Sequence, residues 1–108
     1  MRKYELIQSE QNQWLKKCKA LQQKKYRQEY KEFIAEGLRF VEEALNSHAE
    51  IKMILVAEQQ TQLLEKLFIP QNIPVMLVQK GLLEKCLNTV NPQGIVAISD
   101  SPKGLGTN

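Results

Sequence analysis

The clearest local chemistry in the sequence lies in the segment Glu36-Gly37-Leu38-Arg39, between a short apolar run and a helical pattern. We expect this segment where a strand ends and a helix begins, and in parallel α/β sheets that edge is the usual ligand position. A glycine there lets a ligand approach the backbone, and the unpaired N–H groups of a helix N-terminus attract phosphate. Arg39 adds a bidentate donor for a phosphate or a base. The alternative interpretation is a turn glycine beside a surface arginine.

Basic residues are concentrated in the N-terminal part of the chain. Nine of the 15 Lys and Arg residues lie within residues 1–31, together with three Glu. Lys24, Arg27 and Lys31 follow at helical spacings, so on a helix their side chains would project together and could follow a phosphate backbone. Such a segment indicates a polyanionic partner, and nucleic acid is the commonest one. A solvated, lysine-rich helix face is the alternative.

Side chains that could perform catalysis are scarce. The single histidine, His48, falls in a polar connection, and the single aspartate, Asp100, follows the last apolar run, so no pair is placed for acid–base work or metal binding. Cys18 and Cys86 have no metal-ligand spacing and are predicted to be reduced, partly buried structural thiols. We therefore expect a binding domain that holds no cofactor or metal and is inactive by itself.

Length and composition predict one globular domain in the cytoplasm. The chain has 108 residues, of which 43% are hydrophobic and 25% charged, which is close to the globular average. The longest apolar run, residues 53–57, is far shorter than the roughly 20 residues of a membrane span. Residues 1–31 contain no apolar core of a signal peptide. We therefore expect no association with membranes.

Helices and strands are predicted to alternate along the chain. A helix free of Gly and Pro is expected from Ser9, its N-cap, to Tyr30, with an apolar stripe of Trp14, Cys18 and Leu21. Apolar runs predict four strands, at residues 33–35, 51–56, 73–78 and 94–99. Further helices are predicted at residues 38–45, 59–67 and 80–87.

This order is typical of an α/β fold. It predicts a three-layer α/β/α sandwich with a mostly parallel, four-stranded central sheet. The domain is expected to cover residues 1–100. Residues 101–108 have the composition of a linker toward a missing C-terminal domain, with a frayed natural terminus as the alternative.

Several motifs, taken together, resemble the N-terminal part of SpoU/TrmH-family RNA ribose 2'-O-methyltransferases. The resemblance covers about residues 5–100. It rests on the segments Ser9-x-x-Asn12-x-x-x-Lys16, Leu21, Lys25-Tyr26-Arg27, Phe33-Ile34-Ala35-Glu36-Gly37-x-Arg39, Val41-Glu42-Glu43-Ala44-Leu45 and Thr89-x-x-Pro92-Gln93-Gly94-Ile95-Val96-Ala97. The family has a small residue or Pro and then an aliphatic residue after the Asn, where this chain has Gln13 and Trp14.

The resemblance implies a substrate-binding domain similar to the ribosomal-protein fold that binds kink-turn RNA. In that family the domain delivers structured RNA, ribosomal or transfer, to a knotted C-terminal domain that binds S-adenosylmethionine and dimerises. The motifs of that second domain are not found in this sequence. We therefore expect this chain to be a monomer and the full-length protein to be a homodimer. The alternatives are a stand-alone kink-turn binder and a protein-interaction module without an RNA role.

Charge and resemblance together assign RNA contacts to individual positions. These are Asn12, Lys16, Lys24, Lys25, Arg27, Lys31, Gly37, Arg39, Thr89 and Gln93. Glu36 is interpreted as an acceptor for backbone N–H groups, because an exposed carboxylate would repel phosphate. The turn at residues 89–94 either contacts RNA or shapes the chain. Stacking of bases on aromatic side chains is expected to matter less than shape recognition, since the one tryptophan is assigned to packing.

Overall fold

The structure, a computed structural model, describes residues 3–100, so the predicted linker at residues 101–108 lies outside the described residues. Helices α1 to α3 are α-helices, and η1 and η2 are 3-10 helices. The order of elements is β1 (Glu5–Ile7), α1 (Gln13–Ala20), α2 (Lys24–Tyr30), β2 (Glu32–Glu36), α3 (Leu38–Leu45), β3 (Ile51–Ala57), η1 (Glu58–Lys66), β4 (Val75–Val78), η2 (Glu84–Cys86) and β5 (Ile95–Asp100).

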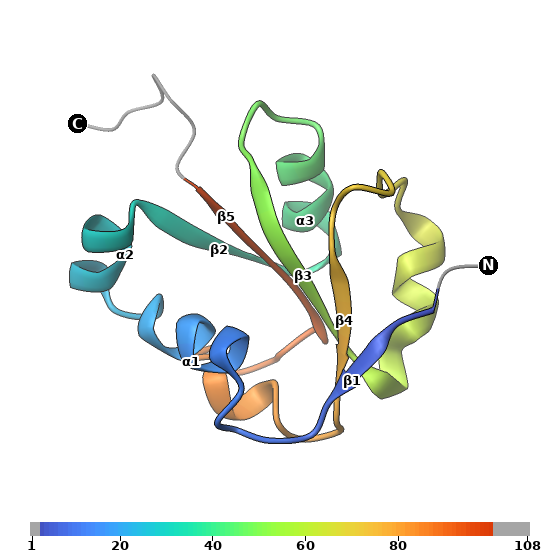
Figure 1. The fold of residues 1–108 in the computed structure, drawn as a ribbon, viewed down its shortest axis with the longest axis horizontal. Helices are drawn as coiled ribbons and strands as arrows, with labels where there is room; N and C mark the ends of the chain where they lie inside the picture. Colours follow the sequence, from blue (N-terminus) through green and yellow to red (C-terminus); the bar gives the residue numbers. More distant parts are fainter. Residues whose placement is uncertain (1–2, 101–108) are drawn as a thin grey trace.

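The described strands form one mixed sheet in the order β1-β4-β3-β5-β2 (Figure 1). Strand β4 pairs in parallel with β1 and β3, whereas β5 is antiparallel to both β3 and β2. The α/β class is thus confirmed, but in place of the predicted mostly parallel, four-stranded sheet the described residues form a mixed sheet of five strands. Strand β1 was missed because only Ile7 in it is buried, which leaves no apolar run in the sequence. The antiparallel direction of β5 could not be predicted from the sequence either. Its residues are buried on both faces, so their pattern is that of a parallel strand.

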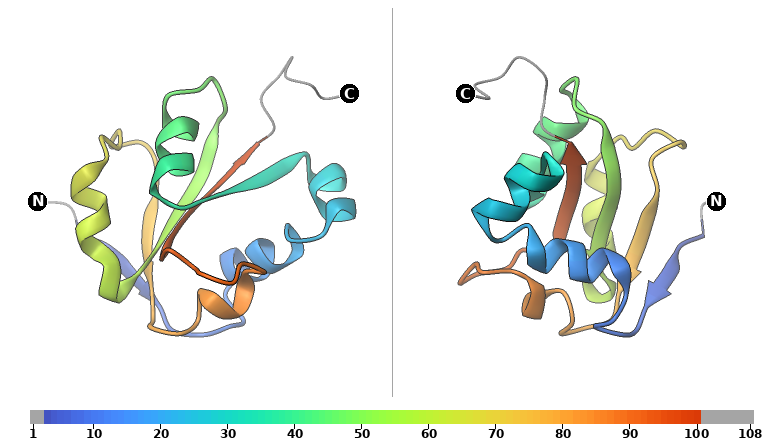
Figure 2. Two further views of the ribbon diagram at one scale, coloured as in Figure 1. Left: turned by 180° about the vertical axis from the view of Figure 1, so that it is seen from behind. Right: turned by 60° about the vertical axis from the view of Figure 1, so that its left-hand side comes forward.

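Alternate residues of the central strands face two separate clusters of buried side chains. Met53 and Leu55 of β3 pack in the cluster that contains residues of α1 and η2. Ile54 and Val56 pack in the other cluster, which includes residues of α3 and lies against η1. The predicted three-layer arrangement is therefore present, with helical segments on both sides of the sheet (Figure 2).

The expected single helix over residues 9–30 is instead two helices that are separated at Leu21. Leu21 is buried, and the Nε2 of Gln22 donates a hydrogen bond to the Cys18 carbonyl (3.1 Å), while its Oε1 accepts from the N–H of Asn88 (3.1 Å). Arg27 Nη1 donates to the carbonyls of Leu21 (2.9 Å) and Gln22 (3.0 Å). These contacts replace helical hydrogen bonds, so the break occurs without Gly or Pro.

Other helix boundaries also differ from the prediction. Helix α1 begins after Asn12, whose Oδ1 accepts from the N–H of Trp14 (2.7 Å), so Ser9 is not the N-cap. The predicted helix at residues 38–45 is confirmed as α3. The segment at 59–67 is the kinked 3-10 helix η1, and the one at 80–87 contains only the short η2.

Both cysteines are free thiols, and they are buried where the sequence predicted partial burial. Burial, with Cys86 and the Glu36 carboxylate nearby, raises the pKa of Cys18 to about 12. Such a thiol stays protonated near neutral pH, and it is therefore a packing residue rather than a nucleophile.

Candidate nucleic-acid interface

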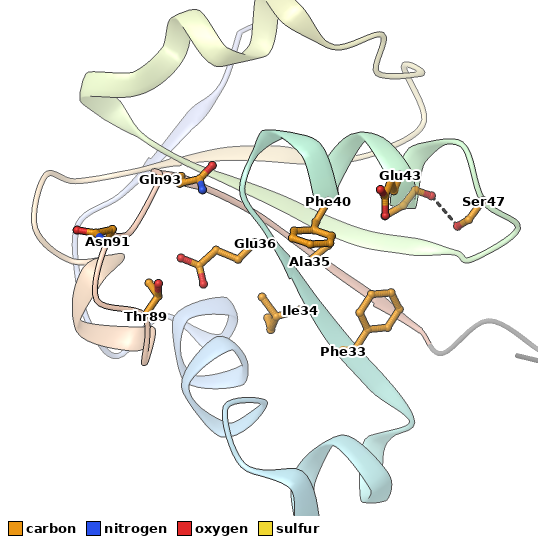
Figure 3. A pocket seen from close by; sticks show the side chains of 11 residues that line it. Phe33, Ile34, Ala35, Glu36, Phe40, Glu43, Ser47, Thr89, Asn91 and Gln93 are labelled. Atoms are coloured by element: carbon orange, nitrogen blue, oxygen red, sulfur yellow. Dashed lines mark hydrogen bonds between the residues drawn. The ribbon is translucent and has the colours of Figure 1, made fainter. Parts of the chain in front are cut away.

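Two concave regions of the surface are lined by three of the predicted site residues, Lys16, Thr89 and Gln93. The first, called the cleft here, lies between β2, α3 and the connection that leads into β5, and it has a volume of about 670 Å³. Figure 3 shows Glu36 at the end of β2, Phe40 on α3, and Thr89, Asn91 and Gln93 on the connection. The cleft is where the two turns predicted from the sequence, at residues 36–39 and 89–94, come together.

Gly37 joins β2 to α3 directly after Glu36, which lines the cleft. Its φ of 96° and ψ of 157° are suited to glycine, and its N–H donates to the Ile95 carbonyl at 2.9 Å. A Cβ on Gly37 would lie 2.7 Å from Oε1 of Gln93. Gly37 is buried, so the close approach it permits is that of the Gln93 side chain. Direct contact of RNA with Gly37 would need Gln93 to move away.

The cleft is acidic and amide-rich. Glu36 and Glu43 line it, and none of the described residues that line it is basic. The Glu36 side chain points toward Thr89 (Figure 3), and burial raises the pKa of its carboxyl. Arg39 lies outside the lining on α3, highly exposed, with its Nε 3.4 Å from Oε2 of Glu43. The cleft therefore offers hydrogen-bonding groups but no cations for phosphate.

The second concave region, called the groove here, lies between α1 and α2 and has a volume of about 550 Å³. The residues that line it are basic, aromatic, amide or small. They are Gln13, Lys16, Lys17, Lys19, Ala20, Gln23, Tyr26 and Tyr30. Among these described residues none is acidic, so the groove attracts anions, in contrast to the cleft.

Tyrosine rings and lysine side chains of α1 and α2 contact one another at the groove. The rings of Tyr26 and Tyr30 are stacked, with centroids 6.0 Å apart and planes inclined by 17°. Lys17 Nζ lies 4.7 Å from the centroid of Tyr30 and 2.7 Å from Oε1 of Glu32, which is nearly buried. Lys25 Nζ lies 5.0 Å from the centroid of Tyr26. The spacing of the two tyrosines, four residues apart, is visible in the sequence, but it did not predict that they line a groove.

The basic residues predicted to contact RNA do not form one stripe. Lys16 lines the groove, and Lys24 and Lys25 are exposed at the start of α2. The guanidinium of Arg27 is bound to backbone carbonyls at the break between the helices. Lys31 ends α2 with a left-handed φ of 56°, so it does not continue the helical spacing of Lys24 and Arg27.

The fold and these surfaces define a class of protein: an α/β/α domain with a basic groove between α1 and α2 and an acidic cleft between β2 and α3. Among residues 3–100 no helix is long and apolar enough to cross a membrane. Within the same range, no three side chains of His, Cys, Asp or Glu gather where they could hold a metal ion.

The family follows from comparison with known proteins. The family model of the MRM3-like substrate binding domain matches residues 12–97, and the chain belongs to this family. The resemblance to SpoU/TrmH substrate-binding domains is thereby confirmed. No curated protein sequence matches the chain significantly.

Similar solved structures are methyltransferases much longer than this chain. An rRNA methyltransferase from Sinorhizobium meliloti is 30% identical with a TM-score of 0.69, over 93% of this chain and 38% of that one. An RNA 2'-O ribose methyltransferase is 24% identical (TM-score 0.72; 95% and 40% covered). The SpoU methyltransferase AviRb from Streptomyces viridochromogenes, in complex with AdoMet, is 18% identical (TM-score 0.65; 84% and 34% covered). The last two show the fold alone, and this chain spans at most 40% of the three proteins.

Proposed function

We propose that this chain binds structured RNA and serves as the substrate-recognition domain of an RNA ribose 2'-O-methyltransferase. One observation carries the proposal: a domain of this substrate-binding family has a groove lined by three lysines and no acidic residue. Phosphates dominate the affinity of proteins for nucleic acids, and clustered lysines neutralise them. The RNA is ribosomal or transfer RNA, in line with the rRNA methyltransferase among the similar structures.

The phosphate contacts are proposed at Lys16 and Lys19, which form no ion pair with any of residues 3–100. Lys17 is held by Glu32 and contributes its charge from a fixed position. Lys24 and Lys25 extend this basic face along α2. Thr89 and Gln93 in the cleft, and Arg39 on α3 outside its lining, are proposed as further contacts. Since no cation lines the cleft, Thr89 and Gln93 would reach ribose or base groups rather than phosphates.

The proposal extends to a longer protein. There this domain would present RNA to a C-terminal catalytic domain that binds S-adenosylmethionine, forms a homodimer and works in the cytoplasm. The AdoMet-bound structure of an rRNA methyltransferase from Sinorhizobium meliloti, 31% identical over 91% of this chain, supports this cofactor for the full-length enzyme. The residues of the present chain would contribute recognition of RNA and not the chemical step.

The test is binding of a fluorescent RNA hairpin, measured by anisotropy, to three proteins at low salt. We expect the wild-type chain to bind, Lys16→Gln/Lys19→Gln to bind at least several-fold more weakly, and Lys66→Gln/Lys80→Gln to match the wild type. The last variant removes the same charge from exposed positions outside the groove. Absence of binding by the wild type at low salt would refute the proposed function.

A further inference from the structure

We propose that the groove between α1 and α2 accepts an unpaired nucleotide of the RNA, with its base against Tyr26 and Tyr30 and its phosphates at Lys16 and Lys19. This inference rests on the proposed function and specifies which part of the RNA the basic face recognises. It departs from the expectation that aromatic stacking plays little part in recognition.

The groove exists because the chain breaks between the two helices. On one straight helix, Lys17 and Tyr30 would be about 20 Å apart, given a rise of 1.5 Å per residue. In the structure the Nζ of Lys17 lies 4.7 Å from the ring centroid of Tyr30. The contacts of Gln22 with Asn88 and of Arg27 with two carbonyls hold the break in place. These contacts therefore fix the arrangement in which the lysines of α1 lie opposite the tyrosines of α2.

The tyrosine pair has the form of a stacking surface. The two rings are almost parallel. Tyr30 is 43% exposed, which is notable for a large hydrophobic side chain. An exposed planar ring beside cations suits a nucleobase, because every base has a flat aromatic face. The ammonium of Lys17 contacts both Tyr30 and Glu32, so it braces the ring in position.

The remaining lining residues fit the other parts of a nucleotide. Lys16 and Lys19 place two ammonium groups on α1, across the groove from the tyrosines of α2. Gln13 and Gln23 offer amide donors and acceptors for the edge of a base. Ala20 is small and leaves space between the helices, and the volume of about 550 Å³ is typical of small-ligand sites.

An unpaired nucleotide is favoured over duplex RNA. In a duplex the faces of the bases are covered by their neighbours, and the sugar–phosphate backbone keeps them away from side chains. A loop, bulge or single-stranded end exposes a base face that can reach Tyr30. The groove would thus position a structured RNA by an unpaired nucleotide next to its helix.

The experiment compares two RNAs: a blunt hairpin, and the same hairpin with a three-nucleotide single-stranded extension. Binding of each is measured by fluorescence anisotropy for the wild type, Tyr30→Leu, Tyr26→Leu/Tyr30→Leu and Tyr26→Phe/Tyr30→Phe. Leucine keeps apolar bulk and removes the ring, whereas phenylalanine keeps the ring. Circular dichroism melting establishes that each variant is folded.

We expect the extension to strengthen binding by the wild type, and the double leucine variant to lose about fivefold or more of its affinity for the extended hairpin. The phenylalanine variant should match the wild type, and the blunt hairpin should be little affected by any tyrosine change. If both hairpins bind equally and the leucine variants match the wild type, this inference is wrong while the proposed function stands. If neither hairpin binds at low salt, the proposed function itself fails.

A second readout applies if the leucine variants do not fold. NMR signals of the Tyr26 and Tyr30 ring protons are followed while a single-stranded trinucleotide is added to the wild-type protein. Upfield shifts of these signals, as caused by a stacked base, support the inference. Unchanged ring signals at concentrations that shift the backbone signals of Lys16 and Lys19 overturn it.

Discussion

The groove and the cleft differ in charge. A third, smaller depression, which is lined by residues that include Arg27 and Glu36, adjoins the cleft on the side of the α1–α2 break. The groove is lined by three lysines and two tyrosines, and the cleft by two glutamates, amides and phenylalanines. We therefore propose phosphate binding at the groove rather than at the cleft. The cleft, where the motif-based interpretation placed the phosphate site, is suited to neutral groups.

The difference teaches that a motif can locate a surface without defining its chemistry. Gly37 does lie against Gln93, and Gln93 lines a cleft of ligand size. However, the glycine accommodates the glutamine side chain, and the charged residues that line the cleft are the glutamates Glu36 and Glu43. Three predictions sharpen the contrast between the two regions.

The largest effect on stability is expected at Gly37, which packs against Gln93 of the cleft. Gly37→Ala should lower the free energy of unfolding by about 2–3 kcal/mol, since the backbone there suits only glycine and the new Cβ would meet Gln93. Gly81→Ala is the matched control, because Gly81 has a φ of 91° but open space around it. Urea denaturation of both variants separates backbone strain from the steric contact. Equal losses would mean that Gln93 does not pack on Gly37.

A smaller loss of stability is expected when Lys17, in the wall of the groove, is replaced. Lys17→Met leaves the nearly buried Glu32 carboxylate without its partner and should cost about 1–2 kcal/mol, because the pair retains some exposure to solvent. Lys17→Met/Glu32→Gln should recover part of this loss, as neither side chain is then an unpaired charge. Chemical denaturation of the single and double variants measures the coupling. Additive losses would contradict a direct interaction.

The smallest effect concerns Glu36 of the cleft and the pH dependence that it gives to the stability of the protein. Burial raises the pKa of this carboxyl above its usual 4.5 in the folded protein. Its contribution to stability is therefore complete below 4.5 and is lost as the pH rises through the folded pKa. Glu36→Gln should gain stability relative to the wild type between acidic and neutral pH. A thermal denaturation series over this range would contradict the account if the difference were constant or reversed.

Sequence patterns predicted the fold where burial is strong and local. Strands β3 and β5 and helix α3 were found from runs and periodicity of apolar residues, whereas β1 has only Ile7 in the core. The break between α1 and α2 depends on Gln22 reaching Asn88, 66 residues away, and no local pattern records such a contact.

The candidate site was predictable to the same extent. The resemblance placed Gly37 with Thr89 and Gln93 in functional turns, and the structure shows these turns side by side. The groove was missed as a unit, since it forms only when the helical segment is divided in two. Periodicity extended one helix through Leu21 and so separated Lys17 from Tyr30.

The salt dependence of RNA binding tests the central claim most directly. The slope of log affinity against log salt concentration is measured with a hairpin for the wild type, Lys16→Gln/Lys19→Gln and Thr89→Ala/Gln93→Ala. Each lost phosphate contact should reduce the slope by about 0.7–0.9, so the lysine variant should have a slope lower by roughly 1.5 and the cleft variant should keep the wild-type slope. A slope that falls for the cleft variant and stays unchanged for the lysine variant would contradict the assignment of phosphate binding to the groove.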